Sequence, residues 1–320
     1  MKHLNYIILI LAIITGCTYA DDEMTIMSFN IKHREKNEGV NRWENRRPIV
    51  SWFLNDISPD IIGLQSLDKN QLVGLEYALS EYKYVGAENV EGAGIGIYNP
   101  IFYKANEFDL ISKSQFWLSE TPDSVGSKGW GSQNTCTVTW GKFRNRDSGH
   151  IFYLFNTEFP SDNQEARIES AKLLLQKVKL IADNAPVIIT GSIFSESKDS
   201  CYQILTGSYI DHYPFSDAEN IATKKITNYN ATYNAYSQDV KLKYDYIFVN
   251  EYFSVYDYSI YPVKKDNIFI SDHYPLMATL IFNSNTNIKV GNTLNLQPAK
   301  QLTSIKKKGL KATSNVSIQF

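Results

Sequence analysis

Residues 60–65 read Asp60-Ile61-Ile62-Gly63-Leu64-Gln65, and residues 186–191 read Pro186-Val187-Ile188-Ile189-Thr190-Gly191. Both runs are almost continuously apolar and rich in β-branched side chains. A strand without polar alternation is typical of the centre of a sheet that is covered on both faces. The two runs therefore predict central strands, and with them a layered α/β fold in which helices cover the sheets.

The strand signature recurs along the chain, and helical spacing appears between the strands. Further short runs of β-branched and aromatic residues, which predict strands, lie at Met24–Asn30, Pro100–Lys104, His150–Phe159, Asp245–Asn250 and Leu276–Phe282. Apolar spacing over Pro48–Asp56 predicts one helix. A second helix is expected to begin near Ser161, where Ser161-Asp162-Asn163-Gln164 fits a capping box, and its apolar stripe continues to Ala182. The pattern alone leaves the strand order open.

The periodicity fades at about Asn283, and the charge changes there as well. The chain has 320 residues and a formal charge of −2, but the segment from Asn283 to Phe320 carries six Lys and no acid, so the rest stands at −8. We expect a globular domain over residues 24–282 and a basic, flexible tail over 283–320. An acidic body does not favour nucleic acid as a partner, although a bound metal would reverse the local sign.

The N-terminus has the pattern of an export signal. Lys2 and His3 precede the apolar run Tyr6–Ile14, which is too short to span a bilayer. Ile14-Thr15-Gly16-Cys17 resembles a bacterial lipobox, with Cys17 as the lipidated residue. We therefore expect residues 1–20 to be a signal, and an exported protein that is either a membrane-anchored lipoprotein or, if cleaved before Asp21, a soluble secreted one. The membrane would be contacted only through the lipid.

Two further cysteines lie inside the expected domain. Cys136 and Cys201 are far apart in sequence, and exported proteins can form disulfides. A disulfide between them and two free buried thiols both stay open.

Six motifs then follow one another with regular spacing. They are Met27-Ser28-Phe29-Asn30 with Trp43-Glu44-Asn45-Arg46-Arg47, then Asp60–Gln65, Phe116-Trp117-Leu118-Ser119-Glu120-Thr121-Pro122, Gly126-Ser127-Lys128-Gly129-Trp130, Lys243-Tyr244-Asp245-Tyr246-Ile247-Phe248 and Ser271-Asp272-His273-Tyr274-Pro275. Together they resemble the endonuclease/exonuclease/phosphatase superfamily, in particular a secreted bacterial branch, from about Met24 to Phe282. The resemblance implies an α/β fold of two packed mixed β-sheets flanked by helices, a deoxyribonuclease-like four-layer sandwich with the site at one end.

The resemblance also implies a chemistry. Cleavage of a phosphate ester places charge on its oxygens, and a dication held by carboxylates, Mg²⁺ or Mn²⁺, compensates that charge. Asn30 matches the residue that helps to place phosphate and metal, and Asp272 matches a metal-side carboxylate. His273 matches the catalytic histidine, and Asp245 the aspartate that orients it. Asn234 lies where family members often carry a substrate-binding Asn.

Five other positions depart from the family pattern. The metal-binding Glu is Ser66, and the Asp-x-Asn element reads Ser192-Ile193-Phe194. A second histidine is Glu158, and its buttressing Glu is Ile97. Ser is a poor ligand for a hard dication, and loss of one positioned acid or base typically costs about 10²–10⁴ in rate.

These departures favour a catalytically impaired family member that binds a phosphorylated ligand, a glycan or a protein partner outside the cell. The alternative is an active metal-dependent phosphoesterase with a rearranged metal site, in which Asp68, Glu158 or Glu196 supplies a replacement carboxylate. A third hypothesis, an unrelated surface protein with chance matches, predicts a fold without two packed sheets. Four arginines, Arg46, Arg47, Arg144 and Arg167, are expected on the surface or on a helix face, with an anion contact as the alternative.

Overall fold

The structure is a computed structural model that describes residues 23–35, 38–90, 96–207, 214–237, 239 and 242–283. Cys17, the expected signal over residues 1–20 and the tail beyond Asn283 lie outside the described residues, so the predictions made for them stay predictions. Among the helices that the structure describes, none combines the length and the apolar character needed to cross a membrane.

The described strands alternate with helices up to residue 85 and again from residue 151 to residue 225, and strands follow one another in between and afterwards. The strands are β1 (Glu23–Asn30), β2 (Ile61–Gln65), β3 (Tyr82–Val85), β4 (Ile101–Lys104), β5 (Phe108–Trp117), β6 (Thr137–Asn145), β7 (Ile151–Glu158), β8 (Val187–Ser192), β9 (Ser216–Asp217), β10 (Lys224–Lys225), β11 (Asp245–Val249), β12 (Phe253–Ile260), β13 (Lys264–Lys265), β14 (Ile268–Phe269) and β15 (Leu276–Phe282). The helices are η1 (Gly39–Asn41), α1 (Trp43–Ile57), α2 (Lys69–Ala78), α3 (Gln164–Ala182), α4 (Ser200–Thr206) and α5 (Ala218–Ile221).

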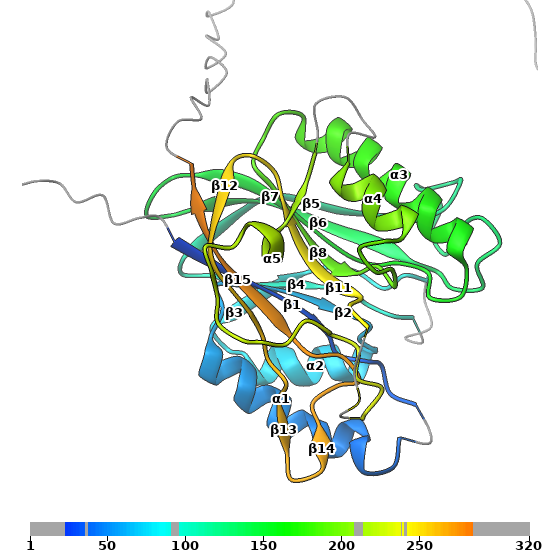
Figure 1. The fold of residues 1–320 in the computed structure, drawn as a ribbon, viewed down its shortest axis with the longest axis vertical. Coiled ribbons are helices and arrows are strands. Elements are labelled where there is room, and N and C mark those ends of the chain that lie inside the picture. Colours follow the sequence, from blue (N-terminus) through cyan, green and yellow to red (C-terminus); the bar gives the residue numbers. More distant parts are fainter. Residues whose placement is uncertain are drawn as a thin grey trace, which may run out of the picture. The chain divides into compact units, whose positions relative to one another are not determined.

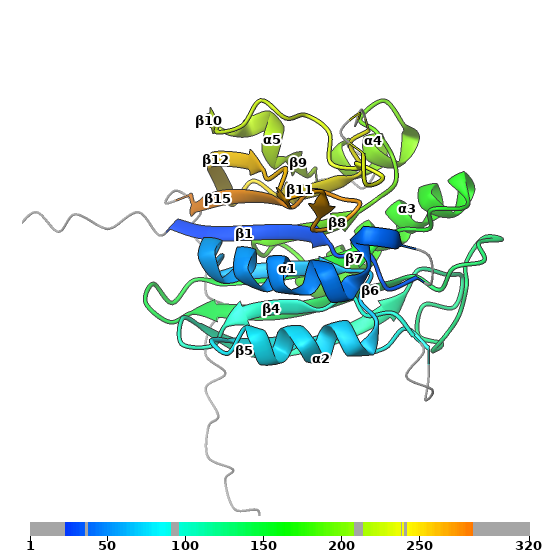
Figure 2. The ribbon, with the colours of Figure 1, turned by 90° about the horizontal axis from the view of Figure 1, so that it is seen from below.

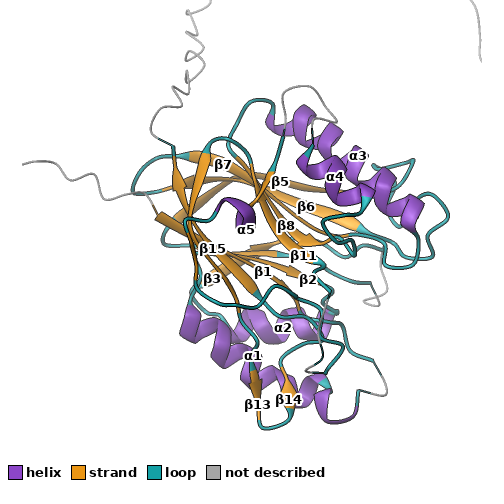
Figure 3. Ribbon diagram, viewed as in Figure 1, coloured by secondary structure: helices purple, strands orange, loops and turns teal. Residues whose placement is uncertain are grey.

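Two mixed sheets form the centre of the domain (Figures 1 and 3). The first has the strand order β10-β12-β15-β1-β2-β4-β3, and the second β5-β6-β7-β8-β11-β9. Parallel pairing occurs between β1 and β2 and between β7 and β8, whereas β15 and β11 pair antiparallel with their neighbours. This arrangement confirms the predicted class of two packed mixed sheets, and it contradicts the hypothesis of chance motif matches.

Three apolar clusters hold the four layers together. One lies between the sheets and contains Ile26, Phe143 and Leu276. A second packs α1 and α2 on the outer face of the first sheet, as Figure 2 shows from below. The third packs the apolar stripe of α3, together with α4, on the outer face of the second sheet. Burial of apolar surface on both faces explains why β2 and β8 show no polar alternation.

Gly63 of β2 allows the two sheets to approach each other closely. A Cβ added to Gly63 of β2 would lie 2.2 Å from Thr190 Oγ1 and 2.6 Å from Asn156 Oδ1 of the opposite sheet. The next inward residue, Gln65, donates from Nε2 to Asn156 Oδ1 at 2.7 Å, and Asn156 Nδ2 donates to the Leu64 carbonyl at 2.7 Å. The sheets are therefore joined by buried amide hydrogen bonds as well as by apolar contacts.

The structure corrects three details of the predicted helices. The capping box at Ser161 is wrong, because Asn163 caps α3 by accepting from the Ala166 N–H. The first helix begins at Trp43, so that Pro48 lies inside it. The sequence interpretation did not include α2, although Asp68 and Gln71 form a complete capping box at its start.

Candidate active site

Site residues that were predicted from distant parts of the sequence meet at one end of both sheets. Asn30 ends β1, Glu158 ends β7, Ser192 ends β8 and Asp245 begins β11. The strand register places Ser192 beside Glu158 on one side and beside Asp245 on the other. Residues that are far apart in the sequence therefore meet because the ends of neighbouring strands lie at the same edge.

A cleft of about 440 Å³ opens at this edge. It is lined by Asn30, Lys32, His33, Ser66, Glu158, Ser161, Arg167, Phe194, Tyr233, Tyr244, Asp272 and His273. A smaller chamber of about 170 Å³ shares part of that wall and adds neutral polar side chains, including Asn89, Asn99, Asn134 and Thr135, together with Ile97 and Cys136. We call Asn30, Asp245, Asp272 and His273 the retained group. Ser66, Ile97, Glu158, Ser192 and Phe194 are the replaced group.

The strongest electrostatic pair of the retained group is buried. His273 Nδ1 donates to Asp245 Oδ2 at 2.7 Å, and the two side chains are 3% and 1% exposed. Burial disfavours an imidazolium, but the charge of Asp245 and its hydrogen bond outweigh that cost and raise the pKa of His273 to about 9. Asp272 and Glu158 act in the same direction. His273 is therefore a cation at neutral pH.

Ser192 of the replaced group is hydrogen-bonded to two residues of the retained group. Its hydroxyl donates to Asp245 Oδ1, and it accepts from Asn30 Nδ2 at 3.1 Å. Asn30 Nδ2 also donates to Glu158 Oε1 at 3.0 Å. Ser192 thus links Asn30 to the Asp245–His273 pair through hydrogen bonds rather than by carrying charge.

Glu158 replaces a histidine of the family pattern, and it lines the cleft. Burial raises the pKa of the Glu158 carboxyl, and the hydrogen bond from Asn30 and the charge of His273 oppose that shift. Of the three carboxylates expected as replacements, Glu158 is the one that contributes to this cleft. Asp68 caps α2 and pairs with Arg34, and Glu196 pairs with Lys198.

Ser66 lies where a metal-binding Glu was expected. Its backbone has φ = 61°, and its N–H donates to Asn99 Oδ1 at 3.0 Å. Ser66 Oγ and His33 Nδ1 share a hydrogen bond of 3.1 Å. Burial, and then the charge of Lys32, lower the pKa of His33, so this imidazole is neutral at pH 7.

Phe194 forms an aromatic wall of the cleft. Its ring meets His273 edge-on at a centroid distance of 6.0 Å and lies 5.7 Å from Tyr244. Tyr233 approaches the same imidazole edge-on at 5.0 Å. Phe194 leaves the 440 Å³ cleft open, and it holds a backbone φ of 46°, which is strained for a bulky side chain.

The loop that carries Asp272 is fixed from below. Ser271 Oγ donates to the Asn30 carbonyl at 2.7 Å, and Asn234 N–H donates to the Asp272 carbonyl at 2.7 Å. Asn234 Nδ2 donates to the Ser271 carbonyl, and Asn234 Oδ1 accepts from Tyr236 N–H. Both ends of the Asn234 amide are therefore bonded to backbone, which indicates a positioning role; the substrate contact stays a prediction.

A divalent cation is the group that the resemblance implies here, and the residues do not fit it. Such ions prefer several carboxylate oxygens. The cleft offers Asp272 and Glu158, and the raised pKa of Glu158 disfavours its anionic form. Within the described ranges, no group of three or more His, Cys, Asp and Glu side chains is arranged to hold one ion. No chemical step is therefore derived through a metal.

Sequence reasoning missed Lys32 and misplaced Arg46. Arg46 is 0% exposed, so the expectation of a surface arginine is wrong for this residue. A signal existed, because Arg46 shares the i, i+4 and i+7 positions with Val50 and Phe53 on the buried face of α1. Arg167 lines the cleft, and its contact with an anion stays a prediction.

Comparison with solved structures identifies the fold. An endonuclease/exonuclease/phosphatase from Bacteroides vulgatus is 30% identical, with a TM-score of 0.76, and the match covers 82% of this chain and 99% of that one. A Bacteroides thetaiotaomicron mannosyl-6-phosphatase is 29% identical, with a TM-score of 0.73, over 81% of this chain and 100% of that one. Two packed mixed sheets with an Asp–His pair at their strand ends define a phosphoesterase-type α/β sandwich. The chain belongs to the endonuclease/exonuclease/phosphatase family.

Two viral proteins are among the more distant relatives in sequence. The L388 protein of Acanthamoeba polyphaga mimivirus is 27% identical over 256 residues, which is 74% of this chain and 92% of that protein. The R895 protein of the same virus is 28% identical over 209 residues, and this match spans only 30% of its length. No family model matches the chain.

Proposed function

We propose that this protein is a catalytically impaired member of its family that binds a phosphorylated ligand instead of hydrolysing it. The observation that carries the proposal is the state of Ser192. The family pattern expects a carboxylate at this position, but the hydroxyl found there is bonded to both Asn30 and Asp245. Ser66 likewise offers a hydroxyl where a second carboxylate is expected. A hydroxyl is a poor ligand for a hard dication, so neither residue holds the metal that would compensate charge on a phosphoryl group under attack.

The cleft supports a phosphorylated, hydroxyl-rich ligand. Lys32, Arg167 and the cationic His273 line the larger chamber and attract an anion. Tyr233, Tyr244 and Phe194 offer aromatic faces to the ring of a sugar, and the smaller chamber offers neutral amides and hydroxyls. The similarity to a mannosyl-6-phosphatase points to the same class, a sugar phosphate. A glycan without phosphate would bring no anion to these cations, and a protein partner would not explain the sugar-sized cleft.

The proposed location is outside the cytoplasm. The lipobox-like sequence that ends at Cys17 supports a lipid-anchored protein, and cleavage before Asp21 would give a secreted one. In either case the binding domain reaches ligands outside the cell.

A second candidate function is an active phosphoesterase with a rearranged metal site that takes Mg²⁺ or Mn²⁺. The specific observation in its favour is that Glu158 and Asp272 line the same cleft. This candidate requires Glu158 to be ionised beside Asp272, because a divalent ion prefers several carboxylate oxygens.

One experiment separates the two candidates. The purified protein is incubated with mannose 6-phosphate or bis(p-nitrophenyl) phosphate in Mg²⁺, in Mn²⁺ and in EDTA, beside the variant His273→Ala. We expect wild type and variant to release phosphate or nitrophenol at the same background rate in all three media. Metal-dependent release that His273→Ala abolishes would establish the second candidate and overturn the first.

A reconstituted variant serves as the positive control. Ser66→Glu, Ser192→Asp and Phe194→Asn together restore the expected family residues at three positions. Metal-dependent hydrolysis gained by this triple variant, and absent from the wild type, attributes the impairment to the replaced group.

A further inference from the structure

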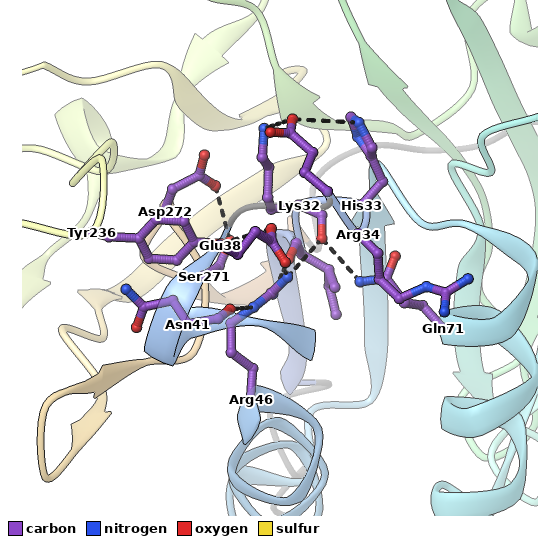
Figure 4. Close-up of polar contacts among 12 residues, drawn as sticks. Lys32, His33, Arg34, Glu38, Asn41, Arg46, Gln71, Tyr236, Ser271 and Asp272 are labelled. Atoms are coloured by element: carbon purple, nitrogen blue, oxygen red, sulfur yellow. Dashed lines mark hydrogen bonds and ion pairs between the residues drawn. The ribbon is translucent and has the colours of Figure 1, made fainter. Parts of the chain in front are cut away.

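Lys32 has an unusual backbone that several contacts hold in place. Its φ is 63°, a left-handed conformation that costs a non-glycine residue roughly 1 kcal/mol or more. Its N–H donates to Asn30 Oδ1 at 3.0 Å. Its carbonyl accepts from Gln71 Nε2 at 2.9 Å and from Arg46 Nη2 at 3.1 Å, as Figure 4 shows. Strain that is over-determined in this way is typical of a functional position.

Arg46 connects this loop to the loop that carries Asp272. The buried guanidinium donates to the carbonyls of Ile31 at 2.6 Å, Asn41 at 2.6 Å and Ile270 at 3.2 Å. Ile31 directly precedes Lys32, Asn41 follows it in η1, and Ile270 lies two residues before Asp272. One side chain thus fixes both walls of the cleft relative to each other.

The backbone turn sends the Lys32 side chain into the cleft, away from Arg46 (Figure 4). Its ammonium is 2.6 Å from Glu35 Oε1, and the side chains of Lys32 and Glu35 are 25% and 51% exposed. Burial lowers the pKa of Lys32, but the hydrogen bond that it donates to Glu35 and the charge of Asp272 outweigh burial and raise it. Lys32 is therefore charged at neutral pH. An ammonium has three donors, and the bond to Glu35 takes one of them.

A phosphate group bound in this cleft needs a cationic side chain, because a carboxylate lies beside it. Asp272 places negative charge beside any bound anion, and the residues do not fit a dication that would compensate it. Lys32 is held by its backbone near Asp272, and Arg167 and His273 line the same chamber. A phosphate group in this chamber meets three cationic side chains.

We propose that Lys32 is the main anion-binding residue of this cleft, and that it captures a phosphate group directly, without a divalent metal. This inference rests on the proposed function, because it names how the non-hydrolysing site holds its ligand. When no ligand is bound, Glu35 accepts a hydrogen bond from the Lys32 ammonium, and it competes with the ligand for this ammonium. A simple surface ion pair between Lys32 and Glu35 would contribute little and would not account for the strained backbone.

Titration calorimetry of the full protein with inorganic phosphate in EDTA tests the inference. We expect phosphate to bind with the same affinity in EDTA as in Mg²⁺. Lys32→Met should weaken binding about 10- to 100-fold, as expected for loss of a charged hydrogen bond. Lys32→Arg should retain most of the affinity, and Glu35→Gln should increase it by about twofold to threefold because a competing carboxylate is removed.

Lys142→Met is the matched control, because Lys142 is half-buried on β6 and packs over the Tyr153 ring rather than lining the cleft. It removes the same formal charge and should leave phosphate binding unchanged. A thermal unfolding midpoint close to that of the wild type shows that each variant is folded; Met keeps the length of the Lys stem and adds no new backbone strain.

The outcomes separate this inference from the proposed function. Phosphate binding that needs Mg²⁺ or Mn²⁺, or that survives Lys32→Met, overturns the inference but leaves a non-hydrolysing protein possible. Equal losses in Lys32→Met and Lys142→Met overturn it too, because they reveal a general charge effect. Metal-dependent hydrolysis by the wild type overturns the proposed function itself.

Discussion

The retained and the replaced groups lie in the same cleft, but they use their polar atoms differently. In the retained group, Asp245 and His273 form a buried charged pair, and Asp272 faces the cleft. In the replaced group, the hydroxyls of Ser192 and Ser66 form hydrogen bonds to neighbouring side chains. The comparison teaches that a site can lack the metal-binding carboxylates of the family pattern and keep its architecture, provided that each substitute side chain still satisfies its neighbours' hydrogen bonds.

The retained and the replaced groups both depend on the buried Arg46, and its removal should have the largest effect on stability. Arg46→Met leaves the carbonyls of Ile31, Asn41 and Ile270 without their donor and leaves Glu38 without its buried partner. We expect a loss of about 3–5 kcal/mol in the free energy of unfolding, measured by urea denaturation. The neighbouring Arg47→Met, on the exposed side of α1, should change stability by less than about 0.5 kcal/mol. Similar losses in both variants would contradict the role given to Arg46.

The charged pair of the retained group should make stability depend on pH. Because the pKa of His273 is raised to about 9 in the folded protein, its stabilising contribution is complete below about pH 6.5, the pKa of an unfolded histidine. It is lost as the pH rises through 9. Urea denaturation between pH 6 and pH 10 should show a fall of a few kcal/mol in the wild type that is absent in His273→Gln. Parallel pH profiles would show that the pair is not charged.

The replaced group can be tested by restoring one charge. Ser192→Asp places a second carboxylate beside Asp245 and removes the donor of its Oδ1 oxygen. We expect a loss of about 1–3 kcal/mol in EDTA, larger than that of Ser192→Ala. Addition of Mg²⁺ should recover part of the loss in Ser192→Asp, read as a rise in the unfolding temperature. An equal loss in both variants would show that charge at this position does not matter.

The smallest effect is expected at the two cysteines of the domain. Cys136, in the wall of the smaller chamber, and Cys201, on the buried face of α4, are both buried and free. Burial raises the pKa of the Cys201 thiol to about 12 and that of Cys136 well above its usual range. Iodoacetamide at pH 8 should therefore leave both unmodified in the folded protein and alkylate both in urea, as read by peptide mass spectrometry. Protection that persists in urea until a reductant is added would indicate a disulfide.

The sequence predicted most of the architecture because the signals that build it are local. The apolar runs at 60–65 and 186–191 became β2 and β8, and the motif positions Asn30, Asp245 and His273 meet in space. The interpretation failed where tertiary contacts decide. The left-handed backbone of Lys32 and the burial of Arg46 depend on loops that meet only after folding.

Element boundaries were also harder to predict than element types. The start of α3 was misassigned because Ser161, Asp162 and Asn163 are all plausible caps, and only the backbone geometry selects Asn163. The short helix α2 was missed because its ten residues carry a weak apolar stripe.

The glycine at position 63 has a consequence for how the cleft can change. A larger residue there would push Thr190 and Asn156 away from β2, and with them the ends of β7 and β8 that carry Glu158 and Ser192. The spacing between the two rims of the binding cleft is thus set by a missing methyl group deep in the sandwich. Even a Gly63→Ala exchange, which touches no ligand, would force the two sheets apart and widen the opening of the cleft.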